Sequence, residues 1–296
     1  MSIIIDGYTR VLVQGITGKE GSFWTQHMID MGTQVVAGVT PGKQGQQCCC
    51  VPVYHSVRNA KSEHKIDASM IFVPPQHAYD AVLEALESNI KLILTLADGI
   101  PLHEQAKIRS AAIEANAIVI GGNTSGIISP GKGMMGSIPY WIDRVYKPGR
   151  IGIMTRSGSL TNEVTSMVVS AGFGVSTLIG IGGDPIPGTR FAELLQAYQN
   201  DVETDALVII GELGSMMEEE VAAMLAEKLF SKPLIAYLSG RTAPPGTRMG
   251  HAGAIISGGK GSVDDKTKAL EQAGAMVAYR PREVGELLRE VLGVLR

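Results

Sequence analysis

Cysteine is scarce in this chain and poorly placed for cross-links. The 296 residues contain three cysteines, and they are consecutive: Cys48, Cys49 and Cys50. Adjacent cysteines make a poor disulfide framework, and a zinc site usually needs spaced ligands in a second cluster. We therefore expect reduced thiols in a loop and no bound metal.

Long apolar runs and clusters of a single charge are also missing. No segment reaches the roughly 20 apolar residues of a membrane-spanning helix. The N-terminal stretch MSIIIDGYTR lacks the basic and apolar regions of a secretory signal. The net charge is −3, and no run of lysine or arginine offers a footprint for nucleic acid. We expect a cytoplasmic protein that binds neither nucleic acid nor membranes.

What the chain does contain is a regular alternation of β-branched runs and amphipathic segments. Such alternation is typical of βα units on a parallel sheet. It is interrupted by a Gly- and Pro-rich stretch over residues 124–149, which we interpret as loose structure joining two halves. We predict an α/β fold with two doubly wound domains, residues 1–125 and 126–296. Strands are expected at residues 10–16, 33–40, 67–75, 91–99, 115–123, 150–158, 175–184, 204–214, 232–240 and 274–280.

A glycine-rich turn follows the first predicted strand. Gly15, Gly18 and Gly21 would let the backbone approach a phosphate at a helix N-terminus. The spacing is not the G-x-G-x-x-G of dinucleotide sites, which also place an acidic residue after the second strand. Here that position is Val39-Thr-Pro-Gly-Lys43. A lysine there suits a ligand with an additional phosphate, either coenzyme A or NADP.

His251 lies between glycines in the stretch RMGHAGAII, which offers an imidazole no packing partners. No metal-ligand spacing surrounds it, and no G-x-S-x-G elbow accompanies it. Nucleophilic or proton-shuttle chemistry remains, with Glu212 at the end of a predicted strand able to hold one ring nitrogen. Ser157, Gly158 and Ser159 should open a helix, either as an anion site or as a plain cap.

Several ordered motifs carry a family resemblance: GVTPGK, GIGGDPIPG, GELG, TAPPGTRMGHAGAII and GGKGS. With them the chain resembles, nearly end to end, the α subunit of succinyl-CoA synthetase (succinate–CoA ligase). Related proteins are the malate–CoA ligase small subunit, citryl-CoA synthetase and the carboxy-terminal part of ATP-citrate lyase. The resemblance implies a Rossmann-like CoA-binding domain and a flavodoxin-like ligase domain. It also implies a nucleoside-diphosphate-forming acid–CoA ligase.

The resemblance further implies roles for individual residues. His251 would be phosphorylated in transit and Glu212 would orient it. Phosphate and the acid would bind near Asn123, Ser157, Gly158, Ser159 and Asn162. Coenzyme A would contact Thr17, Gly18, Lys19, Glu20, Val39, Pro41, Lys43, Pro74, Leu96, Ala97 and Asp98.

A partner is implied as well. ATP or GTP with Mg²⁺ would bind mainly to a separate ATP-grasp β subunit, in an αβ or α₂β₂ assembly.

Departures from the family pattern cluster where the acid should bind. GGNTSG replaces GPNCPG, and SGSLTNE replaces SGTLTYE, so that Asn162 stands where the family has tyrosine. Because an asparagine can pair with a hydroxyl, we expect a hydroxylated or larger acid such as malate or citrate instead of succinate. Two other hypotheses stay open, a non-catalytic CoA-binding homologue and an NADP-dependent oxidoreductase.

Overall fold

The computed structural model describes residues 3–244, 249–256 and 261–293. These residues form two compact units. The N-terminal unit contains Ile4–Ile138 and Ile186–Thr189, and the C-terminal unit contains the remaining described residues. The division after Ile138 falls inside the Gly- and Pro-rich stretch that the sequence indicated as the join.

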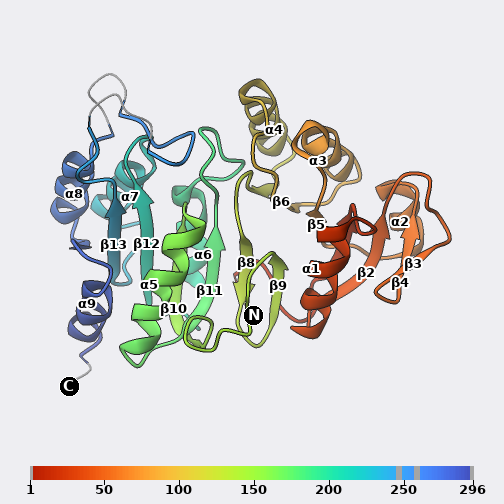
Figure 1. The fold of residues 1–296 in the computed structure, drawn as a ribbon. Helices are drawn as coiled ribbons and strands as arrows, with labels where there is room; N and C mark the ends of the chain where they lie inside the picture. The colour runs from red at the N-terminus through yellow and green to blue at the C-terminus, as the bar shows by residue number, and fades with distance from the viewer. Residues whose placement is uncertain (1–2, 245–248, 257–260, 294–296) are drawn as a thin grey trace. The chain divides into compact units, whose positions relative to one another are not determined.

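The N-terminal unit is built on a largely parallel sheet, as the alternation of elements predicted (Figure 1). The order of its strands is β3-β4-β2-β1-β5-β6-β7, and the β3–β4 pair is antiparallel. The strands are β1 Arg10–Gln14, β2 Gln34–Val39, β3 Gln47–Cys48, β4 Val51–Tyr54, β5 Ala68–Ile71, β6 Leu92–Thr95 and β7 Ile118–Ile120.

Helices cover the sheet of the N-terminal unit. They are α1 Lys19–Asp30, α2 Val57–Glu63, α3 Ala78–Glu87 and α4 Leu102–Glu114, with a short 3₁₀ helix η1 at Pro75–His77. Helix α3 packs between α2 and α4, and the apolar faces of these helices close over Leu12, Ile71 and Ile93 of the sheet. Helix α1 contacts β1 and β2 directly.

The stretch expected to be loose contains a β-hairpin, so that prediction was wrong. Strands β8 (Gly126–Ser129) and β9 (Gly133–Gly136) pair antiparallel. Gly126 and Gly136 face each other with positive φ. A Cβ on Gly126 would lie 2.1 Å from Met135 O, and a Cβ on Gly136 would lie 2.2 Å from Ser125 O, just before β8. The glycines that suggested a loop are therefore what allows these two strands to approach.

The C-terminal unit repeats the plan with parallel strands in the order β14-β13-β12-β10-β11. They are β10 Pro148–Thr155, β11 Val175–Gly180, β12 Ala206–Glu212, β13 Leu234–Ser239 and β14 Met276–Ala278. Helices α5 (Gly158–Ser170) and α9 (Glu283–Val291) pack together, and α7 (Met217–Ala226) packs between α6 (Phe191–Asn200) and α8 (Val263–Gln272) (Figure 1). The carboxyl ends of β10, β12 and β13 meet at one edge of this sheet.

The same ion pair fastens two strands at the amino end of each sheet. Arg10 of β1 binds both carboxylate oxygens of Asp67, and Arg150 of β10 does the same with Asp205. In each pair the aspartate N–H donates to the carbonyl of the arginine. The guanidinium holds the pKa of each aspartate below its ordinary value.

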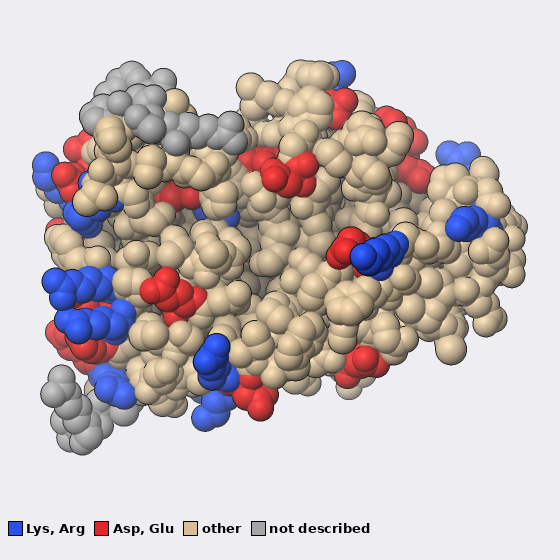
Figure 2. Space-filling view, in the orientation of Figure 1, with Lys and Arg blue, Asp and Glu red and all other residues tan. Residues whose placement is uncertain are grey.

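The surface is mixed in charge. On the face drawn in Figure 2, acidic and basic side chains are interspersed among other residues. None of the helices within the described residues is long and apolar enough to cross a bilayer.

Candidate active site

A buried ion pair joins the ends of two neighbouring strands in the C-terminal unit. Glu212 is the last residue of β12, and Arg156 directly follows β10. Because β10 and β12 are parallel neighbours, the two side chains meet, with 3.1 Å between Arg156 Nη1 and Glu212 Oε1. Their side chains are 0% and 6% exposed, so water screens this attraction very little.

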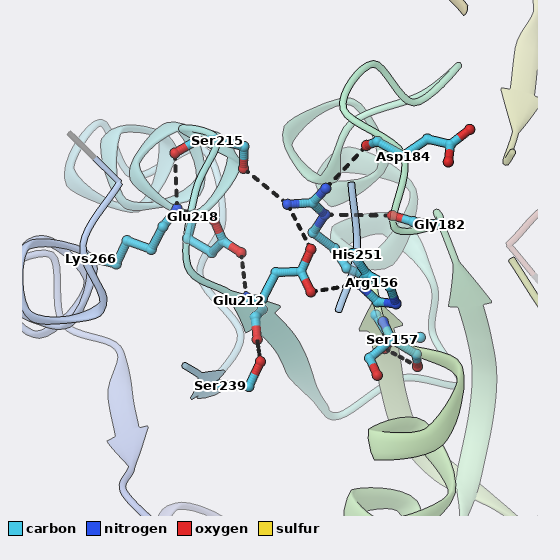
Figure 3. A network of polar contacts seen from close by, with 12 residues as sticks. Arg156, Ser157, Gly182, Asp184, Glu212, Ser215, Glu218, Ser239, His251 and Lys266 are labelled. Atoms are coloured by element: carbon cyan, nitrogen blue, oxygen red, sulfur yellow. Dashed lines mark hydrogen bonds and ion pairs between the residues drawn. The ribbon is translucent and has the colours of Figure 1, made fainter. Parts of the chain in front are cut away.

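The imidazole of His251 contacts the other oxygen of the same carboxylate. Its Nδ1 lies 2.7 Å from Glu212 Oε2. Figure 3 draws the two side chains pointing toward one another. The histidine side chain is 24% exposed, whereas the carboxylate is nearly sealed. A carboxylate on Nδ1 sets the ring orientation and stabilises positive charge on the imidazole, so reaction is directed to Nε2.

Glycine makes room for this imidazole. A Cβ on Gly183 would lie 2.4 Å from His251 Cγ, so the ring rests directly on the backbone of the turn after β11. The motif GIGGDPIPG therefore supplies a backbone surface, free of side chains at Gly183, against which the imidazole packs. That contact explains a glycine that no turn geometry requires.

Arg156 also organises the loops around Glu212. It donates to Ser215 Oγ at 3.3 Å and to the carbonyl of Asp184 at 3.1 Å (Figure 3). The planar guanidinium presents its N–H donors in a rigid fork, so it holds these acceptors in defined directions. The arginine thus ties two loops to the Glu212 carboxylate.

The residues that the sequence placed at a helix start do begin α5. Ser157 is the N-cap and accepts from Leu160 N at 3.3 Å, Gly158 has open space beside it, and Ser159 is exposed. Ser157 is therefore a cap, while the exposed start of the helix retains its partial positive charge. The segment can therefore serve both as a helix cap and as an anion-binding site.

The remaining predicted acid-site residues occupy different settings. Asn162, on α5, accepts through Oδ1 from the hydroxyl of Tyr146 at 2.5 Å. Burial raises the pKa of Tyr146, so this hydroxyl stays protonated and donates. Asn123 belongs to the N-terminal unit, where its backbone N–H donates to Ala97 O.

Two cavities in the N-terminal unit collect most of the residues expected to bind coenzyme A. One of about 600 Å³ is lined by Thr17, Gly18, Val39, Pro41, Lys43 and Pro74 among others. The other, of about 510 Å³, is lined by Gly18, Lys19, Glu20, Pro74, Leu96 and Ala97 among others. Gly18 and Pro74 are common to both linings, so the two spaces adjoin and suit an elongated ligand. Asp98 is not part of either lining.

The glycine turn shapes these cavities as the sequence suggested. Gly15 has φ +78°, and a Cβ on Gly21 would lie 2.2 Å from Gly15 O. Gly18 is the N-cap of α1 and has no side chain to occupy the helix N–H groups. The start of this helix lines both cavities, together with Lys43 in one and Lys19 in the other, a setting that fits phosphate.

Sequence reasoning missed Arg156, Ser215, Glu218 and Lys266. Arg156 immediately precedes the segment SGSLTNE but was not singled out. Nothing in the sequence analysis singled out Glu218 or Lys266, although helical spacing puts Lys266 on the same face of α8 as the buried residues Val263 and Leu270. Parts of the histidine motifs, residues 245–248 and 257–260, lie outside the described residues.

Comparison with known proteins agrees with both units. Residues 6–99 match the family described as CoA binding domain, and residues 154–276 match the CoA-ligase family. The ADP-forming sulfoacetate-CoA ligase subunit SqwL of an Acholeplasma species is 67% identical over 296 residues, 100% of each chain. Subunit alpha 2 of the succinate–CoA ligase [ADP-forming] of Archaeoglobus fulgidus is 50% identical over 292 residues, 99% of this chain and 100% of that one.

The chain belongs to the α subunits of the ADP-forming acid–CoA ligases. The resemblance to the succinate–CoA ligase family, the α/β fold and the assignment as an acid–CoA ligase are thereby confirmed. The ligase subunit also superposes with TM-score 0.90 on ATP citrate lyase of Methanosaeta concilii in complex with (3S)-citryl-CoA. That match has 25% identity and covers 99% of this chain and 52% of the longer one, so the chain spans about half of that protein.

Proposed function

We propose that the ligase subunit carries a phosphorylated His251 between ATP and the acid, and that the acid is sulfoacetate. The observation that carries the first part is the contact of Glu212 with His251 Nδ1 inside a buried pair with Arg156. The second part is supported by the 67% identity to a sulfoacetate-CoA ligase subunit, against 50% to a succinate–CoA ligase subunit.

Phosphorylation uses the geometry at Glu212. His251 Nε2 attacks the γ-phosphorus of ATP with its lone pair, and the bond to the β–γ bridging oxygen breaks, so that ADP leaves with that electron pair. The proton on Nδ1 remains on the ring and is held by Glu212 Oε2, which balances the charge that develops on the imidazole. The triphosphate and Mg²⁺ would be supplied by an ATP-grasp β subunit.

Two further steps complete the reaction: transfer of the phosphoryl group to the acid, and attack by coenzyme A, which the cavities of the N-terminal unit would bind. A carboxylate oxygen of the acid attacks the phosphorus, the N–P bond breaks, and an acyl phosphate forms. The thiolate of coenzyme A then attacks the acyl carbon and phosphate leaves. The helix N-terminus at Ser157, Gly158 and Ser159 would stabilise the anionic phosphoryl group.

Asn162 supports an acid with an anionic head group. Its Oδ1 accepts from Tyr146, so the end of the amide that remains for a ligand is the NH₂ group, a donor. A sulfonate presents three acceptor oxygens. A hydroxylated or larger carboxylate such as malate or citrate is the second candidate, because the same NH₂ group can donate to a hydroxyl oxygen.

A substrate panel tests the choice of acid. The subunit is co-expressed with its ATP-grasp partner, and ADP release is measured with sulfoacetate, succinate, malate, citrate and itaconate in the presence of coenzyme A. We expect the highest kcat/KM with sulfoacetate. A higher kcat/KM with succinate, malate or citrate would overturn that part of the proposal.

Acid-labile labelling tests the phosphohistidine. The complex is incubated with ATP labelled at the γ-phosphorus, and we expect label that is lost in acid and absent from His251→Asn. Equal labelling of His251→Asn would show that another group carries the phosphate.

A further inference from the structure

A cluster of buried charges in the C-terminal unit takes no direct part in the proposed chemistry. Lys266 on α8 and Glu218 on α7 have side chains that are 0% exposed, and Glu219 is 17% exposed. Burying charges so completely is costly unless every one is paired. The three donors of the Lys266 ammonium meet Glu218 Oε2, Glu219 Oε2 at 2.9 Å and Ser215 O at 3.2 Å.

The cluster is connected to Glu212 from two sides. Glu218 Oε1 accepts from the backbone N–H of Glu212 at 3.2 Å. On the other side, Ser215 Oγ accepts from Arg156 Nη1, which also binds the Glu212 carboxylate. The contacts therefore close a ring through Glu212, Glu218, Lys266, Ser215 and Arg156, as Figure 3 shows. We refer to these five residues as the Glu212 ring.

We propose that Lys266 is a positioning residue for phosphoryl transfer, which fixes the direction of the Glu212 carboxylate and so the orientation of His251. This inference rests on the proposed role of His251. Lys266 touches neither the imidazole nor any reacting atom. It acts by holding Glu218 against the backbone of Glu212 while holding the backbone of Ser215, whose hydroxyl engages Arg156.

Loss of the ammonium should loosen both ends of Glu212. Without Lys266 the Glu218 carboxylate is left buried and unpaired, so it would draw away from the Glu212 N–H towards water. Ser215 would lose the contact that fixes its carbonyl. A shift of about 1 Å in a group that orients a reacting atom lowers a rate by about 100-fold.

The test is a single turnover of the α/β complex. The rate of label transfer from γ-labelled ATP to His251 is measured against ATP concentration for the parent and for Lys266→Met. We expect the maximal rate to fall by about 10- to 100-fold. The ATP concentration that gives half of that rate should stay unchanged, and so should binding of coenzyme A to the N-terminal unit.

Two further variants separate positioning from stability. Lys232 is a matched lysine in the same unit, which donates to Tyr198 O and Asp201 O and belongs to no part of the Glu212 ring. Lys232→Met should label at the parental rate. The double variant Lys266→Met/Glu218→Gln removes the unpaired buried charge, and we expect it to melt nearer the parent yet still label slowly. It also decides the question if Lys266→Met does not fold.

The outcomes are distinguishable. If the parent complex carries no label on His251, the proposed function is wrong. If the parent is labelled and either Lys266 variant, folded, is labelled at the parental rate, Lys266 has no positioning role. Recovery of the full rate in the double variant alone would show that the defect came from the unpaired carboxylate.

Discussion

At the scale of single residues, the site depends on one carboxylate with two partners. Glu212 faces His251 through one oxygen and Arg156 through the other. The sequence indicated Glu212 and His251, because a charge at a strand end and an imidazole among glycines suit a site, and because both match positions in the family motifs. It did not indicate Arg156 as the counter-charge, because strand adjacency in space decides which strand ends meet.

Replacement of Arg156 by methionine should destabilise the fold strongly. It would leave the buried Glu212 carboxylate without its guanidinium partner and with only the imidazole of His251 beside it. Breaking a buried ion pair in this way typically costs about 3–5 kcal/mol. Arg150→Met is the matched control, since it breaks a pair in the same unit whose side chains are 54% and 41% exposed. That loss should stay within about 1 kcal/mol. Urea unfolding of both variants measures the difference, and equal losses would contradict the burial argument.

Gly183→Ala should slow phosphorylation of His251 without affecting coenzyme A. The new methyl group would lie 2.4 Å from the ring, so the imidazole must turn away from its contact with Glu212. We expect the labelling rate to fall by about 10-fold or more. Label transfer measures the effect, and calorimetric titration with coenzyme A is the control. An unchanged labelling rate would show that the ring can shift without loss.

At the scale of elements, strand positions were predicted better than strand ends. The predicted strand over residues 204–214 is β12, Ala206–Glu212, and the predicted strand over 175–184 is β11, Val175–Gly180. The apolar core of each run marked the strand, while the glycines after it belong to functional turns. The β8–β9 hairpin was missed because its glycines resemble those of a loop, and only the pairing partner shows why they are needed.

The start of α5 offers a test at this scale. Ser157→Ala removes the cap on Leu160 N and should cost about 1 kcal/mol in the free energy of unfolding. It should also lower the rate of His251 labelling if this helix end holds the phosphoryl group. Ser56→Ala removes the equivalent cap of α2 in the N-terminal unit, where Ser56 Oγ accepts from Asn59 N.

The two cap variants should therefore share a similar stability loss, measured by urea unfolding, while only Ser157→Ala labels slowly. Parental labelling by Ser157→Ala would leave Ser157 as a cap alone.

At the scale of the whole molecule, the two sheets share one arrangement of polar groups. Each has the residues of its proposed site at the carboxyl ends of the strands and an Arg–Asp pair at the amino ends. The α/β class and the repeat of the plan followed from the alternation of elements. The two Arg–Asp ion pairs did not follow from the sequence. Arg10 and Asp67 are 57 residues apart in the chain, and only the pairing of their strands brings them together.

Acid should weaken both units through these pairs. The folded pKa of Asp67 and of Asp205 lies below the ordinary value of 3.8, so the unfolded chain binds more protons between the two values. The stabilisation is therefore complete above that ordinary value and is lost as the pH falls through the folded pKa.

Urea unfolding from pH 6 to pH 3 measures this contribution. The variant Asp67→Asn/Asp205→Asn should lose less stability over this range than the parent. A parallel pH dependence in the two proteins would show that other carboxylates dominate.

The contact of Tyr146 with Asn162 has a consequence for how the enzyme could diversify. Neither residue belongs to the Glu212 ring. The residues proposed to recognise the acid are therefore different from those proposed to orient His251 for phosphorylation. On the proposed role of Asn162, substitution of these two residues would change which organic acid is accepted and would leave the residues that orient His251 in place. Substrate specificity and the chemistry of phosphoryl transfer could then evolve independently, and a protein designer could change the first without changing the second.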